Sequence, residues 1–241
     1  FQIIESKDRQ DTIEFMNLTE FVDLIVPRGG KGLIQTLVDN SKVPFILDGD
    51  GNVHLYIHED AKKENILDIV INSKVQRPGV CNALETLLIN SKIYQDMGSQ
   101  IIEELLENDV ELFVDAKIKE DYPNLNLANS LHYETEFLEL KLAVKLVEND
   151  SQAIEHIKNY SSGHTDAILT ESKEVADNFA KSIDSSVIFI NSSTRFTDGE
   201  MFGFGSEIGI STQKLHVRGP MGLEALTNER YVVTGEGTVR K

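Results

Sequence analysis

The fold of this chain is decided by residues 84–114, which read LETLLINSKIYQDMGSQIIEELLENDVELFV. The apolar run Leu84–Ile89 predicts a buried strand, and Glu111–Val114 predicts a second one. Between them, Tyr94–Glu107 repeats its isoleucines and leucines three and four positions apart, which is the spacing of one helical face. Strand, helix and strand in this order are typical of parallel strands joined by a crossover helix.

The same alternation continues outward in both directions along the chain. Further strands are expected at Leu24–Val26, Val53–Ile57, Leu142–Val147, Ala167–Leu169 and Ser186–Ile190. Further helices are expected at Leu33–Asp39, Ala61–Ser73, Asp150–Lys158 and Ser172–Ser182. We therefore predict an α/β fold with an open, mostly parallel sheet. The turn Asp48–Asn52, dense in Asp and Gly, predicts a domain boundary.

The composition is that of a soluble globular protein, with 241 residues of which 40% are hydrophobic and 26% charged. The net charge of −17 argues against a nucleic acid or an anionic membrane as partner, because it repels phosphate groups. We expect neither a membrane span nor a signal peptide, since no apolar run has the length or the flanks. The single cysteine, Cys81, excludes an intrachain disulfide and fits a reducing cytoplasm.

A glycine-rich turn, Pro27–Ile34, follows the first expected strand and opens a helix. The backbone N–H groups and the dipole at a helix N-terminus favour a bound anion. Arg28 and Lys31 would add charge-assisted hydrogen bonds to a phosphate. The alternative is a tight turn with solvated basic side chains, since the segment matches neither a dinucleotide fingerprint nor a Walker loop.

Cys81 lies in the segment Gln76–Ala83, between an expected helix and an expected strand. A single cysteine is more often a buried apolar filler than a nucleophile. The turn Pro78-Gly79 nevertheless places it in a loop, and Arg77 is close enough in sequence to favour a thiolate. Catalytic groups commonly lie in loops on a rigid scaffold, so the spacing alone supports a nucleophile and a filler equally.

Two polar segments follow later in the chain. His164, next to Asp166, suggests an oriented imidazole, although we favour a structural role for this turn. The segment Asn191–Arg195 comes directly after an expected strand, so its polar groups would converge at that strand's carboxyl end. Such groups suit a carboxylate or phosphate ligand, or they form a polar loop.

Metal binding has little support in the sequence. His54 and His58 cluster with Glu59 and Asp60, but the two histidines lie in a strand-like stretch. Their spacing of four residues is therefore not that of a helical metal pair, and we predict no metal site.

Several long motifs, in this order along the chain, resemble the gamma-glutamyl phosphate reductases of the aldehyde dehydrogenase superfamily. They are Pro27–Ile34, Arg77–Leu88, Val147–Ile168, Gly205–Thr212, Arg218–Leu223 and Tyr231–Arg240. The resemblance implies an aldehyde dehydrogenase-like catalytic domain with part of a Rossmann-like cofactor domain. It also implies NADPH-dependent reduction of L-glutamyl 5-phosphate to glutamate 5-semialdehyde, a step of proline synthesis.

The resemblance implies roles for individual residues. Cys81 is the expected nucleophile that forms a thioester, and the backbone N–H groups of Cys81 and Asn82 are the expected donors to an oxyanion. The expected contacts to NADPH are Arg28, Gly29, Gly30, Lys31 and Glu136. The expected contacts to substrate are Arg77, His164, Thr165, Asn191, Ser193, Thr194 and Arg195. We also expect a homo-oligomer that pairs through Tyr231–Val233, and glutamate 5-kinase is a candidate partner.

The expected division into domains has three parts. Residues 1–47 would end the NADPH-binding domain, residues 48–218 would form the catalytic domain, and residues 219–241 would hold a return segment and the oligomerisation strand. The chain begins at Phe1 and is shorter than members of the family, so most of the cofactor-binding domain is expected to be missing from it. Three interpretations stay open: a reductase, an inactive or weakly active fragment that self-associates, or the reductase domain of a bifunctional pyrroline-5-carboxylate synthetase.

Overall fold

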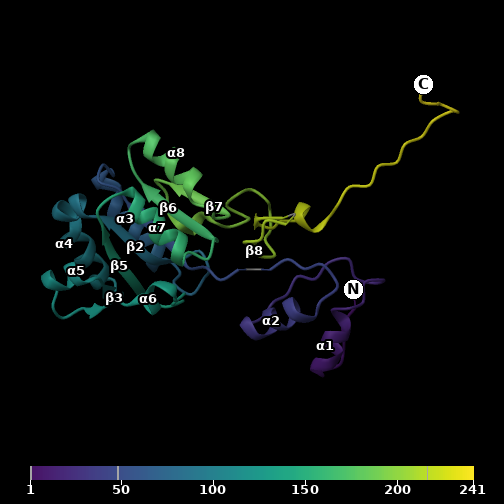
Figure 1. Cartoon of the computed structure of the whole chain (residues 1–241), viewed down its shortest axis with the longest axis horizontal. Coiled ribbons are helices and arrows are strands. Elements are labelled where there is room, and N and C mark those ends of the chain that lie inside the picture. Colours follow the sequence, from purple (N-terminus) through teal and green to yellow (C-terminus); the bar gives the residue numbers. More distant parts are fainter. Residues whose placement is uncertain (1, 48, 216) are drawn as a thin grey trace.

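The computed structural model describes residues 2–47, 49–215 and 217–241 (Figure 1). Asp48, where the expected catalytic domain begins, and the side chain of Lys31 lie outside the described residues. A seven-stranded sheet dominates the chain, and every pair of neighbouring strands in it is parallel. In spatial order its strands are β4 (Asn126–Leu127), β3 (Glu111–Val114), β5 (Lys141–Val147), β2 (Leu84–Asn90), β1 (Val53–Ile57), β6 (Thr165–Leu169) and β7 (Val187–Ile190).

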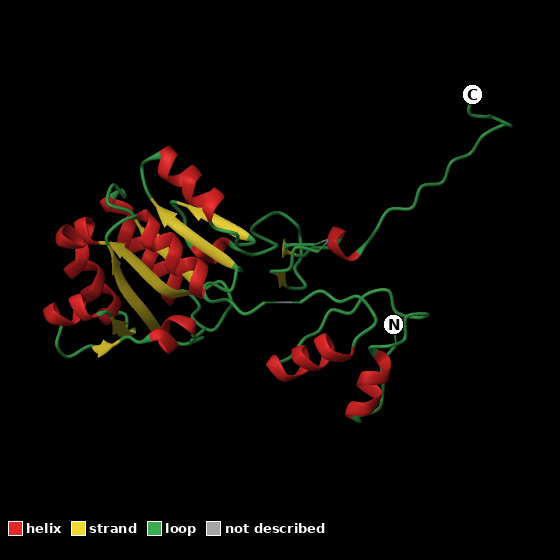
Figure 2. Cartoon of the chain, in the orientation of Figure 1, coloured by secondary structure: helices red, strands yellow, loops and turns green. Residues whose placement is uncertain are grey.

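Helices cover both faces of the sheet, which explains why its central strands are buried throughout (Figure 2). One face packs against α3 (Lys63–Val75), α4 (Ser91–Glu107) and α5 (Ala116–Asp121). The other face packs against α7 (Asp150–Tyr160) and α8 (Lys173–Ser182). The predicted α/β fold with a parallel sheet is thereby confirmed.

Side-chain caps set where the helices begin. The Asn90 side chain accepts a hydrogen bond of 2.9 Å from the Lys92 N–H, so α4 starts at Ser91 rather than at the expected Tyr94. Asn149 and Ser172 cap α7 and α8 in the same way. Each of these caps is the last residue of a strand or lies within three residues of its end, so the chain turns from sheet to helix without a long loop.

The N-terminal segment lies apart from the two layers around the sheet (Figure 1). It contains α1 (Arg9–Phe15) and α2 (Lys31–Asn40). The strand expected at Leu24–Val26 is reduced to one parallel bridge between Ile25 and Phe45, so this prediction was wrong. Hydrogen bonds of 3.1 Å from the Lys42 and Val43 N–H groups to the Met16 carbonyl connect the ends of the two helices instead.

The C-terminal segment returns to the sheet and then leaves it. β8 (Ile210–Ser211) pairs antiparallel with β9 (Gly219–Pro220), and a short 3-10 helix, η2 (Glu224–Leu226), follows. The remaining chain extends away from the molecule (Figure 1). The small elements β4, α5 and α6 (Ser130–Glu134) were not expected, because each has too few residues to show a period in the sequence.

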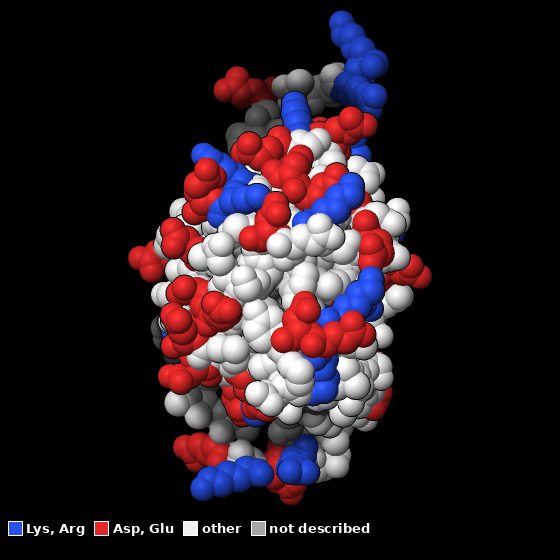
Figure 3. Space-filling view, turned by 90° about the vertical axis from the view of Figure 1, so that its left-hand side faces the viewer, with Lys and Arg blue, Asp and Glu red and all other residues white. Residues whose placement is uncertain are grey.

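Charge is dispersed over the surface that Figure 3 displays, where carboxylates are widespread and Lys and Arg side chains are interspersed among them. Within the described residues, no helix has both the length and the apolarity to cross a bilayer. In the same residues, no group of three or more His, Cys, Asp and Glu side chains is arranged to hold a metal ion.

Candidate functional site

Cys81 lies at the amino edge of the sheet, in the loop that joins α3 to β2. Its side chain is partly buried, and Cys81 lies within a turn closed by a hydrogen bond from the Ala83 N–H to the Val80 carbonyl. Gly51, just before β1, packs directly on this loop. A Cβ atom at Gly51 would lie 1.7 Å from the carbonyl oxygen of Cys81, so only glycine fits there. The backbone of Cys81 is thus held in place by a neighbouring strand.

Asn82 anchors the loop from the other side. Its Nδ2 donates a hydrogen bond of 2.8 Å to the Thr197 carbonyl, and its own carbonyl accepts one of 2.8 Å from the Thr194 hydroxyl. The side chain is buried, and it tethers the Cys81 loop to the 3-10 turn η1 (Thr194–Phe196). Ser193 caps this turn by accepting from the Arg195 N–H. Ser193 and Thr194 therefore stabilise the turn that supports the Cys81 loop.

Two arginines bring positive charge to Cys81. The Arg195 Nε donates a hydrogen bond of 2.8 Å to Gln76, which starts the Cys81 loop. Burial lowers the pKa of Arg195 and the nearby Arg77 lowers it further, while Cys81 and Asp198 act in the opposite direction. Arg195 is thus within electrostatic reach of both Arg77 and Cys81. Such a pair of cations favours a thiolate and attracts anionic groups of a ligand.

Asn191 does not join this group. It lies at the carboxyl end of β7 with φ of 55°, and its side chain bonds the Thr170 N–H and carbonyl at 2.9 and 2.7 Å. The chain then turns back, so that Arg195 reaches the amino edge. The expectation that residues 191–195 converge at a carboxyl end was therefore wrong, because η1 reverses the chain's direction.

His164 and Thr165 are fully buried at the amino end of β6. The His164 Nδ1 lies 2.8 Å from the Thr165 hydroxyl, which in turn lies 2.8 Å from the Thr197 hydroxyl. Asp166 accepts hydrogen bonds from the His54 N–H and from the Ser161 hydroxyl, which tie β6 to β1 and to the end of α7. These contacts favour the structural interpretation of this turn.

A cleft of about 810 Å³ opens between the N-terminal segment and the amino edge of the sheet. Three of the five expected cofactor contacts line it, namely Gly29, Gly30 and Glu136. Gly30 is the N-cap of α2, and no side chain caps the first N–H groups of that helix. A Cβ atom at Gly30 would meet nothing within 4 Å, so the cleft stays open to a ligand there. Arg28 is exposed beside it.

The cleft and the Cys81 loop share a wall. Glu136 accepts a hydrogen bond of 2.7 Å from the Gly51 N–H, and Gly51 contacts the Cys81 carbonyl. Gly49 and Asp50, which also line the cleft, lead directly into Gly51. A ligand in the cleft would therefore lie next to the backbone that positions Cys81.

Sequence reasoning missed Gly51 and the buried pair of Lys74 and Glu85. Glu85 gave one usable signal, because a carboxylate inside the apolar run of β2 calls for a partner. Gly51 gave none, since it sits in a turn where glycine is expected for other reasons. Only the contact with Cys81, 30 positions later in the numbering, shows why it must be glycine.

No protein-family model matches the chain. The gamma-glutamyl phosphate reductase of Thermoanaerobacter pseudethanolicus is 49% identical over 240 residues, which cover 100% of this chain and 58% of that protein. The enzyme of the same name from Bacillus mycoides is 48% identical over the same share of each chain. The chain therefore spans little more than half the length of these relatives.

Solved structures agree with this similarity. The crystal structure of gamma-glutamyl phosphate reductase from Thermotoga maritima matches with a TM-score of 0.94 and 46% identity, over 99% of this chain and 57% of that one. An acetylating aldehyde dehydrogenase from Geobacillus thermoglucosidasius matches with a TM-score of 0.72 and 18% identity, over 97% of this chain and 61% of that one. The second match shows a shared fold.

Proposed function

Because this chain is a homologue of gamma-glutamyl phosphate reductases, in the aldehyde dehydrogenase superfamily, we propose that it carries their catalytic site. The proposed reaction is the NADPH-dependent reduction of L-glutamyl 5-phosphate to L-glutamate 5-semialdehyde and phosphate. The observation that carries the proposal is the setting of Cys81. It is the chain's only cysteine, partly buried, fixed by Gly51 and within reach of Arg195.

The chemistry proceeds on the Cys81 sulfur. The thiolate attacks the acyl carbon, an S–C bond forms, and the bond to phosphate breaks with phosphate as the leaving group. NADPH, when bound, supplies the hydride that reduces the resulting thioester. The S–C bond then breaks, which releases the aldehyde and restores Cys81. In each tetrahedral state, the backbone N–H groups of Cys81 and Asn82 are the proposed donors to the oxyanion.

The arginines are proposed to bind the anionic ends of the substrate. Arg77 is close enough to Arg195 to help lower the pKa of the Arg195 guanidinium, so one anion between the two side chains would relieve that repulsion. A phosphate or a carboxylate would both meet this requirement. Planar guanidinium groups bind either anion through two parallel hydrogen bonds.

The cleft fits part of a dinucleotide. The uncapped N-terminus of α2 offers N–H groups and a positive dipole to a phosphate, and Gly30 leaves room for close approach. Glu136, on the opposite wall, offers carboxylate oxygens of the kind that bind ribose hydroxyls. We propose that Gly29, Gly30 and Glu136 hold NADPH next to the Cys81 loop.

The test compares the wild-type chain with Cys81→Ser by the phosphate-dependent reduction of NADP⁺ with glutamate 5-semialdehyde. Loss of the nucleophile should lower kcat by about a thousandfold or more, with an unchanged thermal midpoint. A folded Cys81→Ser variant that retains turnover would refute the proposal. An inactive wild-type chain whose Cys81 fails to react with iodoacetamide at neutral pH would favour a non-catalytic fragment.

Self-association is a second proposed function. Tyr231, Val232 and Val233 are 84%, 76% and 92% exposed in the extended C-terminal segment. Aromatic and β-branched residues in an extended chain are well suited to pair with a strand of a second copy. Sedimentation of wild type and Val232→Pro tests this, because proline removes a ladder donor. Equal oligomeric states in the two proteins would contradict pairing through this segment.

A further inference from the structure

Lys74 and Glu85 form an ion pair that is completely buried. The Lys74 Nζ lies 2.8 Å from the Glu85 Oε2, and both side chains have 0% exposure. Lys74 is in the last turn of α3, and Glu85 is the second residue of β2. The Cys81 loop is the connection between these two elements. The pair therefore closes the base of the loop.

The second oxygen of Glu85 reaches a different segment. Its Oε1 accepts a hydrogen bond of 3.1 Å from the N–H of Leu138, which has φ of 55°. Leu138 is two residues after Glu136, whose Oε1 accepts from Gly51. Gly51 in turn contacts the Cys81 carbonyl. The contacts thus form a closed ring that runs from the base of the Cys81 loop, through the cleft wall, back to Cys81.

Stability alone does not account for this pair. Burial raises the pKa of Glu85 to about 7, against the opposing effect of Lys74. Burial likewise lowers the pKa of Lys74, against the effects of Glu85 and then Glu136. When desolvation opposes the attraction in this way, apolar replacements of similar volume are often as stable as the ion pair. An apolar pair, however, could not accept the Leu138 hydrogen bond.

We propose, on the basis of the function proposed above, that Lys74 and Glu85 are positioning residues for the reaction. They hold the Cys81 loop and the Glu136 segment in one fixed relation, so that the loop keeps its place next to the wall of the cleft. They act through the backbone of both segments and do not touch substrate. Loss of the pair loosens the loop, which exposes Cys81 more often and places it less well for hydride transfer.

The experiment uses Lys74→Met/Glu85→Leu, which replaces the charges by apolar groups of similar size, and Glu85→Gln, which keeps an acceptor for Leu138. Cys81 is the only cysteine, so the rate of iodoacetamide alkylation reports its exposure directly. In the double variant we expect alkylation to become about fivefold faster or more, while kcat falls about tenfold or more. Glu85→Gln should lie between the double variant and wild type.

The matched control is Lys63→Met/Asp96→Leu, which removes a solvent-exposed pair of 2.7 Å that also joins α3 to another element. It should leave alkylation and kcat unchanged. A folded double variant with wild-type alkylation and kcat overturns the proposal. If the double variant does not fold, Glu85→Gln decides, and wild-type values there overturn it as well. Retained turnover in Cys81→Ser would refute the proposed function but would not alter the alkylation contrast.

Discussion

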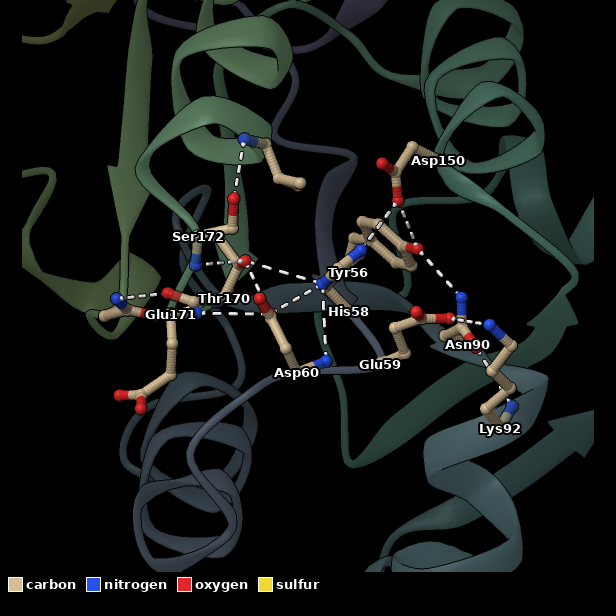
Figure 4. A network of polar contacts seen from close by, with 12 residues as sticks. Tyr56, His58, Glu59, Asp60, Asn90, Lys92, Asp150, Thr170, Glu171 and Ser172 are labelled. Atoms are coloured by element: carbon tan, nitrogen blue, oxygen red, sulfur yellow. Dashed lines mark hydrogen bonds and ion pairs between the residues drawn. The ribbon is translucent and has the colours of Figure 1, made fainter.

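At the carboxyl edge of the sheet, polar side chains from neighbouring strands bond to one another (Figure 4). His58, after β1, lies with its Nδ1 2.6 Å from Asp60 and its Nε2 3.3 Å from Asp150. The Thr170 hydroxyl donates to Asp60 at 2.7 Å, and the Tyr56 hydroxyl donates to Asp150 at 2.9 Å. These side chains thereby have hydrogen-bond partners within the protein.

The amino edge is organised differently. There the partly buried Cys81 lies within reach of Arg195, beside a cleft of about 810 Å³. Ligands of open parallel sheets usually bind at the carboxyl edge. In this chain a network of hydrogen bonds occupies part of that edge, and Cys81, the proposed nucleophile, lies at the other. We therefore expect variants at the carboxyl edge to change mainly stability and variants at the amino edge to change mainly activity.

The largest effect is expected from Gly51→Ala at the amino edge. The added methyl group would lie 1.7 Å from the Cys81 carbonyl oxygen, so the loop must move. A displacement of about 1 Å costs on the order of 100-fold in rate, and the overpacking costs roughly 1–3 kcal/mol of stability. Steady-state kinetics and denaturant unfolding measure the two effects. Gly235→Ala, in the extended C-terminal segment, should change neither.

A smaller effect is expected from Arg195→Gln. Hydrogen bonds to charged groups contribute about 1.5–3 kcal/mol, so kcat/KM should fall roughly 10- to 100-fold. Arg240→Gln, near the end of the chain, is the matched control. Unchanged kcat/KM in Arg195→Gln would show that the positive charge of Arg195 has no part in the proposed mechanism.

The pH dependence of stability is expected to reflect His156, a buried residue of α7. Burial lowers the pKa of His156 to about 3, and His54 and Lys145 add to this effect. Below pH 6.5 the unfolded chain therefore binds one more proton here than the folded chain, so stability falls as pH decreases toward about 3.

The titration of His156 should change the unfolding free energy by at most about 1.4 kcal/mol per pH unit. His156→Phe should remove this contribution. Between pH 6.5 and 4.5, the unfolding free energy of the variant should therefore change less with pH than that of wild type, by at most about 1.4 kcal/mol per pH unit. Denaturant titrations at several pH values measure the difference. Parallel curves for the two proteins would show that His156 is not kept neutral by the fold.

The smallest effect on activity is expected from Asp60→Asn at the carboxyl edge. Desolvation acts against the Asp60 carboxylate, but hydrogen bonds from Thr170, His58 and the Glu171 N–H outweigh it and lower its pKa. Its stabilising contribution is therefore lost as pH falls below the usual carboxyl range. Asp60→Asn should lower stability by about 1 kcal/mol at neutral pH and leave kcat/KM within about twofold. A large loss of kcat/KM would break the division between the two edges.

Most of the fold could be predicted from the sequence, because strands and helices are indicated by hydrophobic patterns within short segments. β1 and β3 begin and end where they were predicted. β1 is buried along its whole length, as expected of a central parallel strand, whereas β3 fully buries only Leu112 and Val114. Helix starts were less well placed, because the cap at Asn90 depends on one side-chain hydrogen bond. The expected strand at Leu24–Val26 failed because only Phe45 pairs with it.

The site was less accessible to sequence reasoning. Cys81 and Arg77 could be named because they are neighbours in the chain. The reversal after Asn191, which carries Arg195 to the amino edge, left no pattern in the sequence. The contacts of Gly51 with Cys81 and of Glu85 with Leu138 join segments that are far apart in the chain.

By itself, the sequence determined the class of fold, the position of most of the longer strands and helices, and the loop in which the single cysteine lies. These follow from hydrophobic period and residue type, which are properties of short segments. Only the tertiary structure decided which edge of the sheet holds Cys81 and what keeps it in place. The position of Cys81 depends on packing between segments that are distant in the chain. The contact of Gly51 with the Cys81 backbone and the buried charge of Glu85 are not visible in the residues next to them in the sequence.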